Sequence, residues 1–147
     1  MGARFVRFPD WDIKLADYIS EVRDDRFEWG VHDCLTFADG AVKAQRGDGI
    51  CDDWIGGYTT AKGAMRKYIN HTREGIEDDI IDSLDNRLFR LDTNLPPRGA
   101  VVAMPIDDGA VFNYALGIMV THKAAFVTVE GLILSDVTDN CIFWGLE

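Results

Sequence analysis

The hydrophobic pattern of this 147-residue chain changes its period at the stiff stretch Pro96-Pro97-Arg98-Gly99. Before that stretch, apolar residues recur at helical spacing over residues 11–24, and again from Cys34 to the stop at Gly47-Asp48-Gly49. After it, short apolar runs are separated by turn residues, a pattern typical of strands. Helices first and strands second predict an α+β fold, in which N-terminal helices pack on a C-terminal antiparallel sheet, rather than alternating βαβ units.

The remaining elements follow from the same periodicities. Two more helices are expected before the break, one on Ala61, Ala64, Met65 and Tyr68 and a short acidic one on Ile76, Ile80, Ile81 and Leu84. Strands are expected at residues 100–104, 114–120, 124–129, 132–134 and 141–144, with turns at Asp107-Asp108-Gly109 and Thr121-His122-Lys123. Gly40 falls inside the second helix and costs up to about 1 kcal/mol relative to alanine unless close packing requires it.

Composition and charge bound the class of protein. A chain of 147 residues with 47% hydrophobic residues is long enough for one domain, residues 1–147, with its own core. The net charge of -10 argues against a nucleic-acid partner and is compatible with a basic protein partner. No apolar run approaches the ~18 residues of a transmembrane helix, and the first ten residues hold no apolar signal region. We therefore expect no transmembrane segment and synthesis in a cytosol.

Metal ligands and disulfides are not indicated by the cysteine and histidine spacing. The residues concerned are Cys34, Cys51, Cys141, His32, His71 and His122. Three widely spaced cysteines make a poor disulfide framework, and no pair of ligands matches the spacing of a zinc motif. Cys51 and Cys141 are expected to be packing residues, and we expect neither a metal nor a cofactor.

Cys34 is the candidate catalytic residue. It begins the second predicted helix after a glycine-containing turn, so it is expected in the first helical turn. The partial positive charge and free N–H groups of a helix N-terminus favour the thiolate, which is the nucleophile. Alternatively, Cys34 is a small buried apolar residue on the helix stripe. Asp33 is the expected N-cap, and its carboxylate raises the pKa of a neighbouring thiol by like-charge repulsion.

His32 is the candidate partner of Cys34, because it is the nearest histidine in the sequence. Residues two apart point in different directions in a helix and share a face only by chance in a turn. His32 could lie over the thiol, as a general base requires, or could instead bond a backbone carbonyl of the turn. His122 is expected in an exposed hairpin turn, and His71 at the C-terminus of the third helix.

These residues carry a resemblance to a known family. Trp29-Gly30, Asp33-Cys34 and Phe37-Ala38 resemble the nucleophile segment of NlpC/P60-type cysteine peptidases. The stretches Pro97–Val102 and Ala115–Ile118 are similar to that family's first two sheet strands. The closest similarity is to small NlpC/P60-like proteins of phage and prophage tail regions, through Trp29–Cys34, Gly56–Thr59, Leu116–Ile118 and Trp144, and it spans residues 10–145.

The resemblance implies a papain-like NlpC/P60-type fold with Cys34 as nucleophile, but this chain departs from the family at three positions. The strand histidine that acts as general base falls at Ala115, the aspartate before the first strand at Ala100, and a tyrosine near the oxyanion at Phe27. None of these side chains can move a proton. Only Cys34 carries over from the family, with His32 as the sole substitute base.

Two functions from different classes follow as expectations. The first is a phage tail tip or baseplate-associated protein with a degenerate hydrolase site, a structural subunit or an assembly factor. Its location would be the tail of the virion after synthesis in the bacterial host cytoplasm, and its partners other tail proteins. The alternative is an active cysteine peptidase or amidase that cleaves the peptide stem of peptidoglycan during phage entry, with Cys34 as nucleophile and His32 as base.

Overall fold

The structure is a computed structural model, and it describes residues 6–28, 30–50, 60, 80–105 and 114–146. Its helices are α1 (Trp11–Val22), α2 (Cys34–Arg46) and α4 (Ile80–Arg87). Its strands are β1 (Phe89–Leu91), β2 (Val101–Pro105), β3 (Tyr114–Met119), β4 (Ala124–Thr128), β5 (Gly131–Ser135) and β6 (Ile142–Gly145). The α+β prediction is confirmed. The predicted helix at residues 61–68 and the turn at Asp107-Asp108-Gly109 lie outside the described residues.

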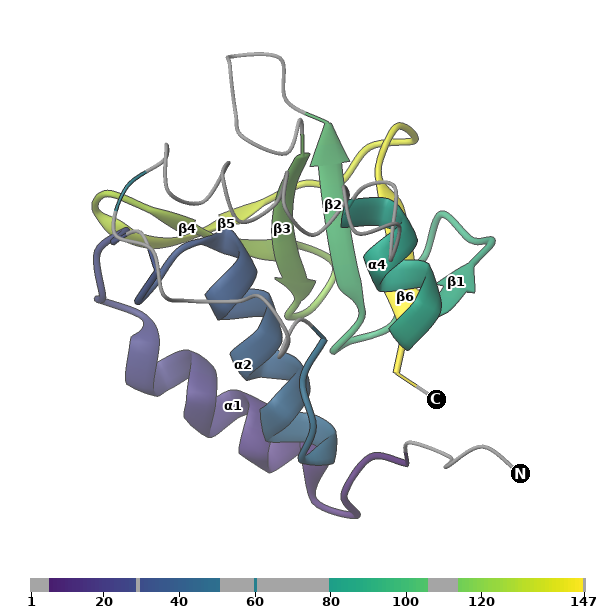
Figure 1. Cartoon of the computed structure of the whole chain (residues 1–147), viewed down its shortest axis with the longest axis horizontal. Coiled ribbons are helices and arrows are strands. Elements are labelled where there is room, and N and C mark those ends of the chain that lie inside the picture. The colour runs from purple at the N-terminus through teal and green to yellow at the C-terminus, as the bar shows by residue number, and fades with distance from the viewer. Residues whose placement is uncertain (1–5, 29, 51–59, 61–79, 106–113, 147) are drawn as a thin grey trace.

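The six strands form one sheet in the order β1-β6-β2-β3-β4-β5, and every neighbouring pair is antiparallel (Figure 1). Strands β2 to β5 are a meander, as the sequence predicts. Strand β6 returns beside β2, where Val101 faces both Ile118 of β3 and Trp144 of β6. Strand β1 was not predicted, because its three residues are mostly exposed and show no period. It extends the sheet beyond β6.

Helix α2 begins and ends with strong local signals. The Asp33 side chain accepts a hydrogen bond from the Thr36 backbone N–H at 2.8 Å, and the Thr36 hydroxyl accepts one from the Asp33 N–H at 2.7 Å. Such a capping box stabilises a helix start by about 1 kcal/mol. At the other end, Gly47 adopts a φ of 93°, which favours glycine, and its N–H bonds the Lys43 carbonyl. Both predicted boundaries of this helix are confirmed.

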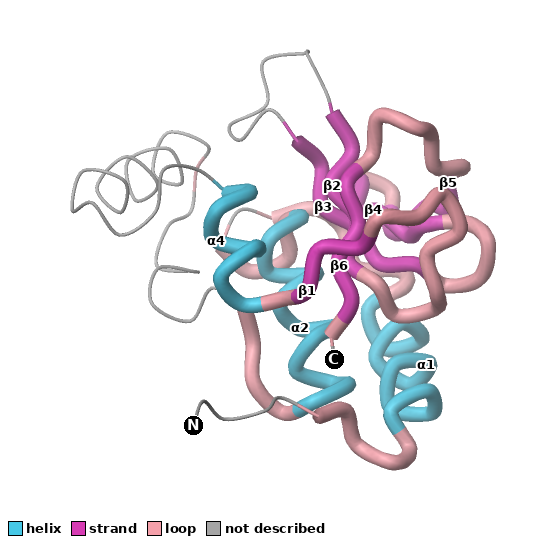
Figure 2. Tube along the Cα trace, turned by 90° about the vertical axis from the view of Figure 1, so that its right-hand side faces the viewer, coloured by secondary structure: helices cyan, strands magenta, loops and turns pink. Residues whose placement is uncertain are grey.

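Helix α2 lies between α1 and the sheet, and the two helices run side by side (Figures 1 and 2). The Tyr18 ring of α1 stacks on Phe37 of α2 with centroids 5.9 Å apart, and its hydroxyl donates to the Phe37 carbonyl at 3.0 Å. A Cβ atom at Gly40 would collide with the Tyr18 hydroxyl. Close helix packing therefore explains the glycine inside the apolar stripe.

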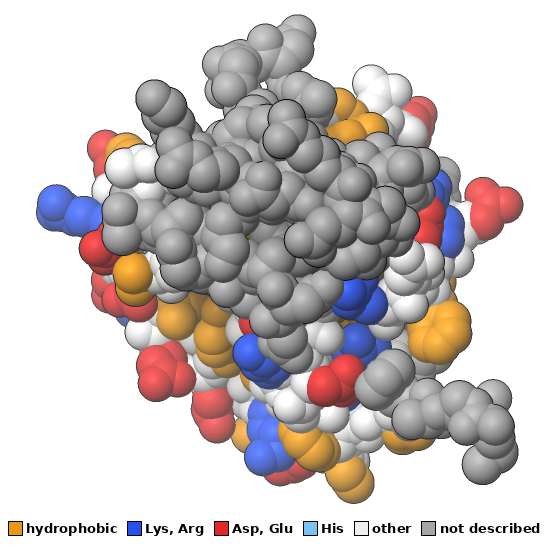
Figure 3. Space-filling view, in the orientation of Figure 1, with side chains coloured by type: hydrophobic (Ala, Val, Ile, Leu, Met, Phe, Trp, Pro, Cys, Tyr) orange, Lys and Arg blue, Asp and Glu red, His pale blue; other side chains and the backbone are white. Residues whose placement is uncertain are grey.

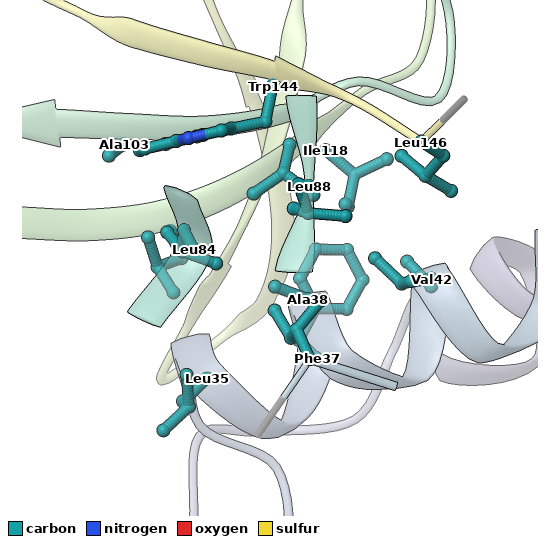
Figure 4. Close-up of a cluster of buried hydrophobic side chains, with 14 of the residues drawn as sticks. Leu35, Phe37, Ala38, Val42, Leu84, Leu88, Ala103, Ile118, Trp144 and Leu146 are labelled. Atoms are coloured by element: carbon teal, nitrogen blue, oxygen red, sulfur yellow. The ribbon is translucent and has the colours of Figure 1, made fainter. Parts of the chain in front are cut away.

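Two apolar clusters occupy the two faces of the sheet. The larger one joins helices α1, α2 and α4 to one face and includes Phe37, Val42, Ile118 and Trp144 (Figure 4). The smaller one lies on the opposite face and includes Val102, Met119, Phe126 and Phe143. Because neighbouring residues of a strand point to opposite faces, β2, β3, β4 and β6 each contribute to both clusters.

Polar contacts fix α4 to the sheet. Asp85 of α4 accepts hydrogen bonds from the Trp144 indole N–H at 2.8 Å and from the Arg90 guanidinium at 2.9 and 2.8 Å. These bonds lower the pKa of Asp85, with the Arg90 hydrogen bond as the largest cause.

None of the described helices is long and apolar enough to cross a membrane.

Candidate active site at the start of helix α2

A tight loop delivers Cys34 to the first position of α2. Glu28 and His32 pair through their backbones, with N–O distances of 3.0 and 2.8 Å, and Gly30 between them has a φ of 80°. The Gly30 N–H also donates to the second Asp33 carboxylate oxygen at 2.9 Å. The buried Asp33 carboxylate therefore holds the loop with one oxygen and the helix start with the other.

The Cys34 thiol is partly buried against strand β3, and its pKa is raised to about 11. Burial is the largest cause, because it disfavours the charged thiolate, and the neighbouring Asp33 carboxylate raises the pKa further. The backbone N–H of Leu116, with smaller contributions from those of Leu35 and Cys34, favours the thiolate but does not compensate. The expectation of an easily ionised thiol is therefore wrong, since burial outweighs the effect of the helix N-terminus.

His32 is buried, with 7% of its surface exposed, and its ring meets the edge of Phe37 at a centroid distance of 6.1 Å. Its Nε2 atom is buried and has no hydrogen-bond partner among the residues that the structure describes. Within the described part of the chain, no hydrogen bond joins His32 to Cys34. The ring instead borders a cavity of about 360 Å³ together with Asp25, Arg26 and Glu28. His32 and Cys34 are thus two residues apart in the sequence, but their side chains do not form a catalytic dyad.

Strand β3 presents different residues to the two faces of the sheet. Tyr114 and Leu116 pack against the larger cluster, on the side of α2 and Cys34. Ala115 packs against the smaller cluster together with Met104, its cross-strand neighbour. The position to which the resemblance assigns the base therefore lies on the face opposite the helices, and the strand residues on the Cys34 side carry no imidazole.

The other two departures from the family pattern have structural roles. Ala100 is buried in the smaller cluster. Phe27 donates its backbone N–H to the Thr128 carbonyl at 3.0 Å, which fixes the loop before α2 to strand β4. Neither residue places a polar side-chain group near the Cys34 sulfur.

The remaining candidates lie away from this site or outside the described residues. His122 is in the exposed turn between β3 and β4, as predicted. Cys141 is buried with its sulfur 3.7 Å from the Thr138 hydroxyl, which agrees with a packing role. Cys51 and His71 are not among the described residues. Across the described ranges, no group of three or more histidine, cysteine or acidic residues could hold a metal.

The fold and the site define an α+β protein with a poorly ionised cysteine at the start of its second helix. Over residues 6–146, the chain matches the family described as a domain of unknown function, DUF6950, and it belongs to that family. A comparison with curated proteins finds no match. The sequence alone indicated Cys34, but it gave no sign that the Leu116 backbone would contact the sulfur.

Proposed function

We propose that this protein is a phage tail tip or baseplate-associated protein that keeps a papain-like, NlpC/P60-type fold with a degenerate cysteine-hydrolase site. Its role in the particle is structural or lies in tail assembly. The tail assignment rests on the resemblance to small NlpC/P60-like tail-region proteins. The observation that supports a degenerate site is Cys34: it begins the helix at which a hydrolase presents its nucleophile, yet its pKa is raised to about 11 and it has no imidazole partner among the described residues.

The chemistry of a cysteine hydrolase explains why this state matters. The thiolate attacks the carbonyl carbon of an amide, and a general base normally takes the thiol proton. A pKa of about 11 leaves about one thiol in ten thousand ionised at pH 7. Losing an aligned base costs on the order of 10²–10⁴ in rate. The two effects together leave at most feeble hydrolysis.

The arrangement of elements supports the papain-like part of the proposal. Helix α2, with the cysteine at its start, packs on strands β3 and β4 of an antiparallel sheet whose strands follow the helices in sequence. The fold alone does not define function, so the residues of the site must distinguish an active hydrolase from a protein that has lost hydrolase activity. On the face drawn in Figure 3, acidic and basic side chains of the described surface are interspersed, which suits a protein contact better than a nucleic-acid backbone.

The alternative is an active cysteine peptidase or amidase acting on the peptide stem of peptidoglycan, with His32 as base. The observation that favours it is the buried Nε2 atom of His32, which has no hydrogen-bond partner in the described part of the chain. Activity would require the loop from Glu28 to Asp33 to rearrange so that the ring reaches the sulfur. The backbone pairing of Glu28 with His32 and the Asp33 cap oppose that movement.

Purified particles of a phage that encodes this chain test the proposal. Quantitative mass spectrometry should find the chain at a fixed ratio to other tail proteins, and Cys34→Ala should leave infectivity unchanged. The purified protein should release no peptides from peptidoglycan. If the chain is found in lysates but not in particles, its role is in assembly. Peptide release that requires both Cys34 and His32 would instead establish the peptidase alternative.

A further inference from the structure

A groove of about 650 Å³ lies between the chain that leaves β1 and the chain that enters β6. The β1–β6 ladder ends at the pair Leu91 and Phe143. Beyond that pair, residues 92–94 line one wall of the groove, and Asp139 and Cys141 line the other. Strand β1 therefore covers β6 only as far as Phe143, and Ile142 of β6 borders the groove.

The floor of the groove is apolar. Leu91, Cys141 and Phe143 line it, and all three belong to the smaller cluster, so the groove opens over the sheet face opposite the helices. Phe143 and Cys141 are almost fully buried, whereas Leu91 is only partly covered. Leu91 therefore supplies most of the apolar surface of the floor that a ligand can reach.

The rim of the groove is negative. Asp92 and Asp139 are exposed on its two walls. Arg90 is the cation of the lining, but its guanidinium makes two hydrogen bonds to Asp85 and lies 5.4 Å from the Trp144 ring centroid. Because Asp85 balances its charge, the two rim carboxylates dominate the local field, and the net charge of -10 adds to it.

We propose that this groove binds a basic, extended segment of a partner protein. A lysine or arginine of that segment would lay its methylene groups on Leu91 and place its charge between Asp92 and Asp139. An extended peptide suits a groove bounded by two chain segments, because alternate residues then face the floor and the solvent. The inference goes beyond the proposed function: it uses no residue at the start of α2 and holds whether or not the chain is a tail component.

A short fluorescein-labelled peptide of alternating lysine and valine is the probe, and its binding is followed by fluorescence anisotropy. The double variant Asp92→Asn and Asp139→Asn should weaken binding about tenfold at low salt. The matched control removes two exposed carboxylates elsewhere, through Asp24→Asn and Glu130→Gln, and should leave binding within about twofold. All four positions are exposed, so both double variants should fold.

Backbone amide shifts in the NMR spectrum locate the bound peptide. Shifts concentrated at residues 90–94 and 139–143 support the groove. Equal weakening in the two double variants would show attraction to the net charge alone and overturn the proposal. So would equal binding of a peptide in which glutamate replaces lysine, or shifts that fall mainly elsewhere.

Discussion

Replacing Tyr114 with histidine should bring an imidazole to the side of β3 that faces Cys34. Tyr114 packs on the same cluster as Leu116, whose backbone N–H reaches the Cys34 sulfur. Tyr114 is partly buried and begins its strand, so histidine is easier to accommodate there than at the fully buried Leu116. The Tyr114→His variant therefore tests whether the site lacks only a base.

The size of the effect follows from the pKa of the thiol. Burial raises the pKa of Cys34 from 9.0 to about 11, so its reaction with iodoacetamide near neutral pH should be about a hundredfold slower than that of an unperturbed thiol. An imidazolium within a few ångström lowers a thiol pKa by about 1–3 units. Tyr114→His should thus accelerate alkylation of Cys34 at least about tenfold.

Mass spectrometry of alkylated peptides measures the rate at Cys34 separately from the rates at Cys51 and Cys141. The matched control is Ala115→His, which adds the same imidazole one residue along the strand. Because Ala115 packs on the opposite face of the sheet, this control should leave the rate at Cys34 unchanged. Equal acceleration by both variants, or by neither while both give native circular dichroism, would refute the assignment of faces around the sulfur.

Further outcomes are expected at the same helix and its neighbour. Asp33→Asn keeps a side-chain oxygen for the Thr36 N–H but removes the charge and the oxygen that accepts from the Gly30 N–H, so the pKa of Cys34 should fall, its alkylation should accelerate, and the free energy of unfolding should drop by about 1–3 kcal/mol. Gly40→Ala should lower the free energy of unfolding by about 1–3 kcal/mol in guanidinium titrations, because the new methyl group meets Tyr18. The pKa of Cys34 is higher in the folded state than in the unfolded state, so deprotonation of the thiol favours unfolding. The free energy of unfolding should therefore fall by up to about 2 kcal/mol as the pH rises from about 9 to about 11. Cys34→Ala should remove that part of the pH dependence, whereas an unchanged profile would contradict the high pKa.

The sequence predicted most of the described fold because its local signals agree with its tertiary packing. The N-cap Asp33 and the C-terminal Gly47 bound α2 through backbone hydrogen bonds that neighbouring residues supply. The alternation of Tyr114, Leu116 and Ile118 places β3 between two apolar clusters. Strand β1 was not predicted because it pairs with residues of β6 that are more than fifty positions away in the sequence.

The sequence predicted the position of Cys34 better than the ionisation of its thiol. Periodicity placed Cys34 at the start of a helix, and the structure agrees. The ionisation of the thiol depends instead on how much of the sulfur β3 covers, which is a long-range property. The balance between burial, Asp33 and three backbone N–H groups cannot be read from neighbouring residues. The family resemblance put the base position at Ala115, and in the structure Ala115 packs on the sheet face opposite Cys34.

The requirements of the fold and of a nucleophile oppose each other at the start of α2. The carboxylate of Asp33 satisfies the Gly30 and Thr36 N–H groups, and these bonds stabilise the loop and the helix. The same negative charge next to Cys34 raises the pKa of the thiol. An active hydrolase overcomes such a penalty with an imidazolium partner, which stabilises the thiolate by more than the carboxylate destabilises it. Without an imidazole partner among the described residues, the Asp33 carboxylate still caps the helix while the pKa of the neighbouring thiol stays raised.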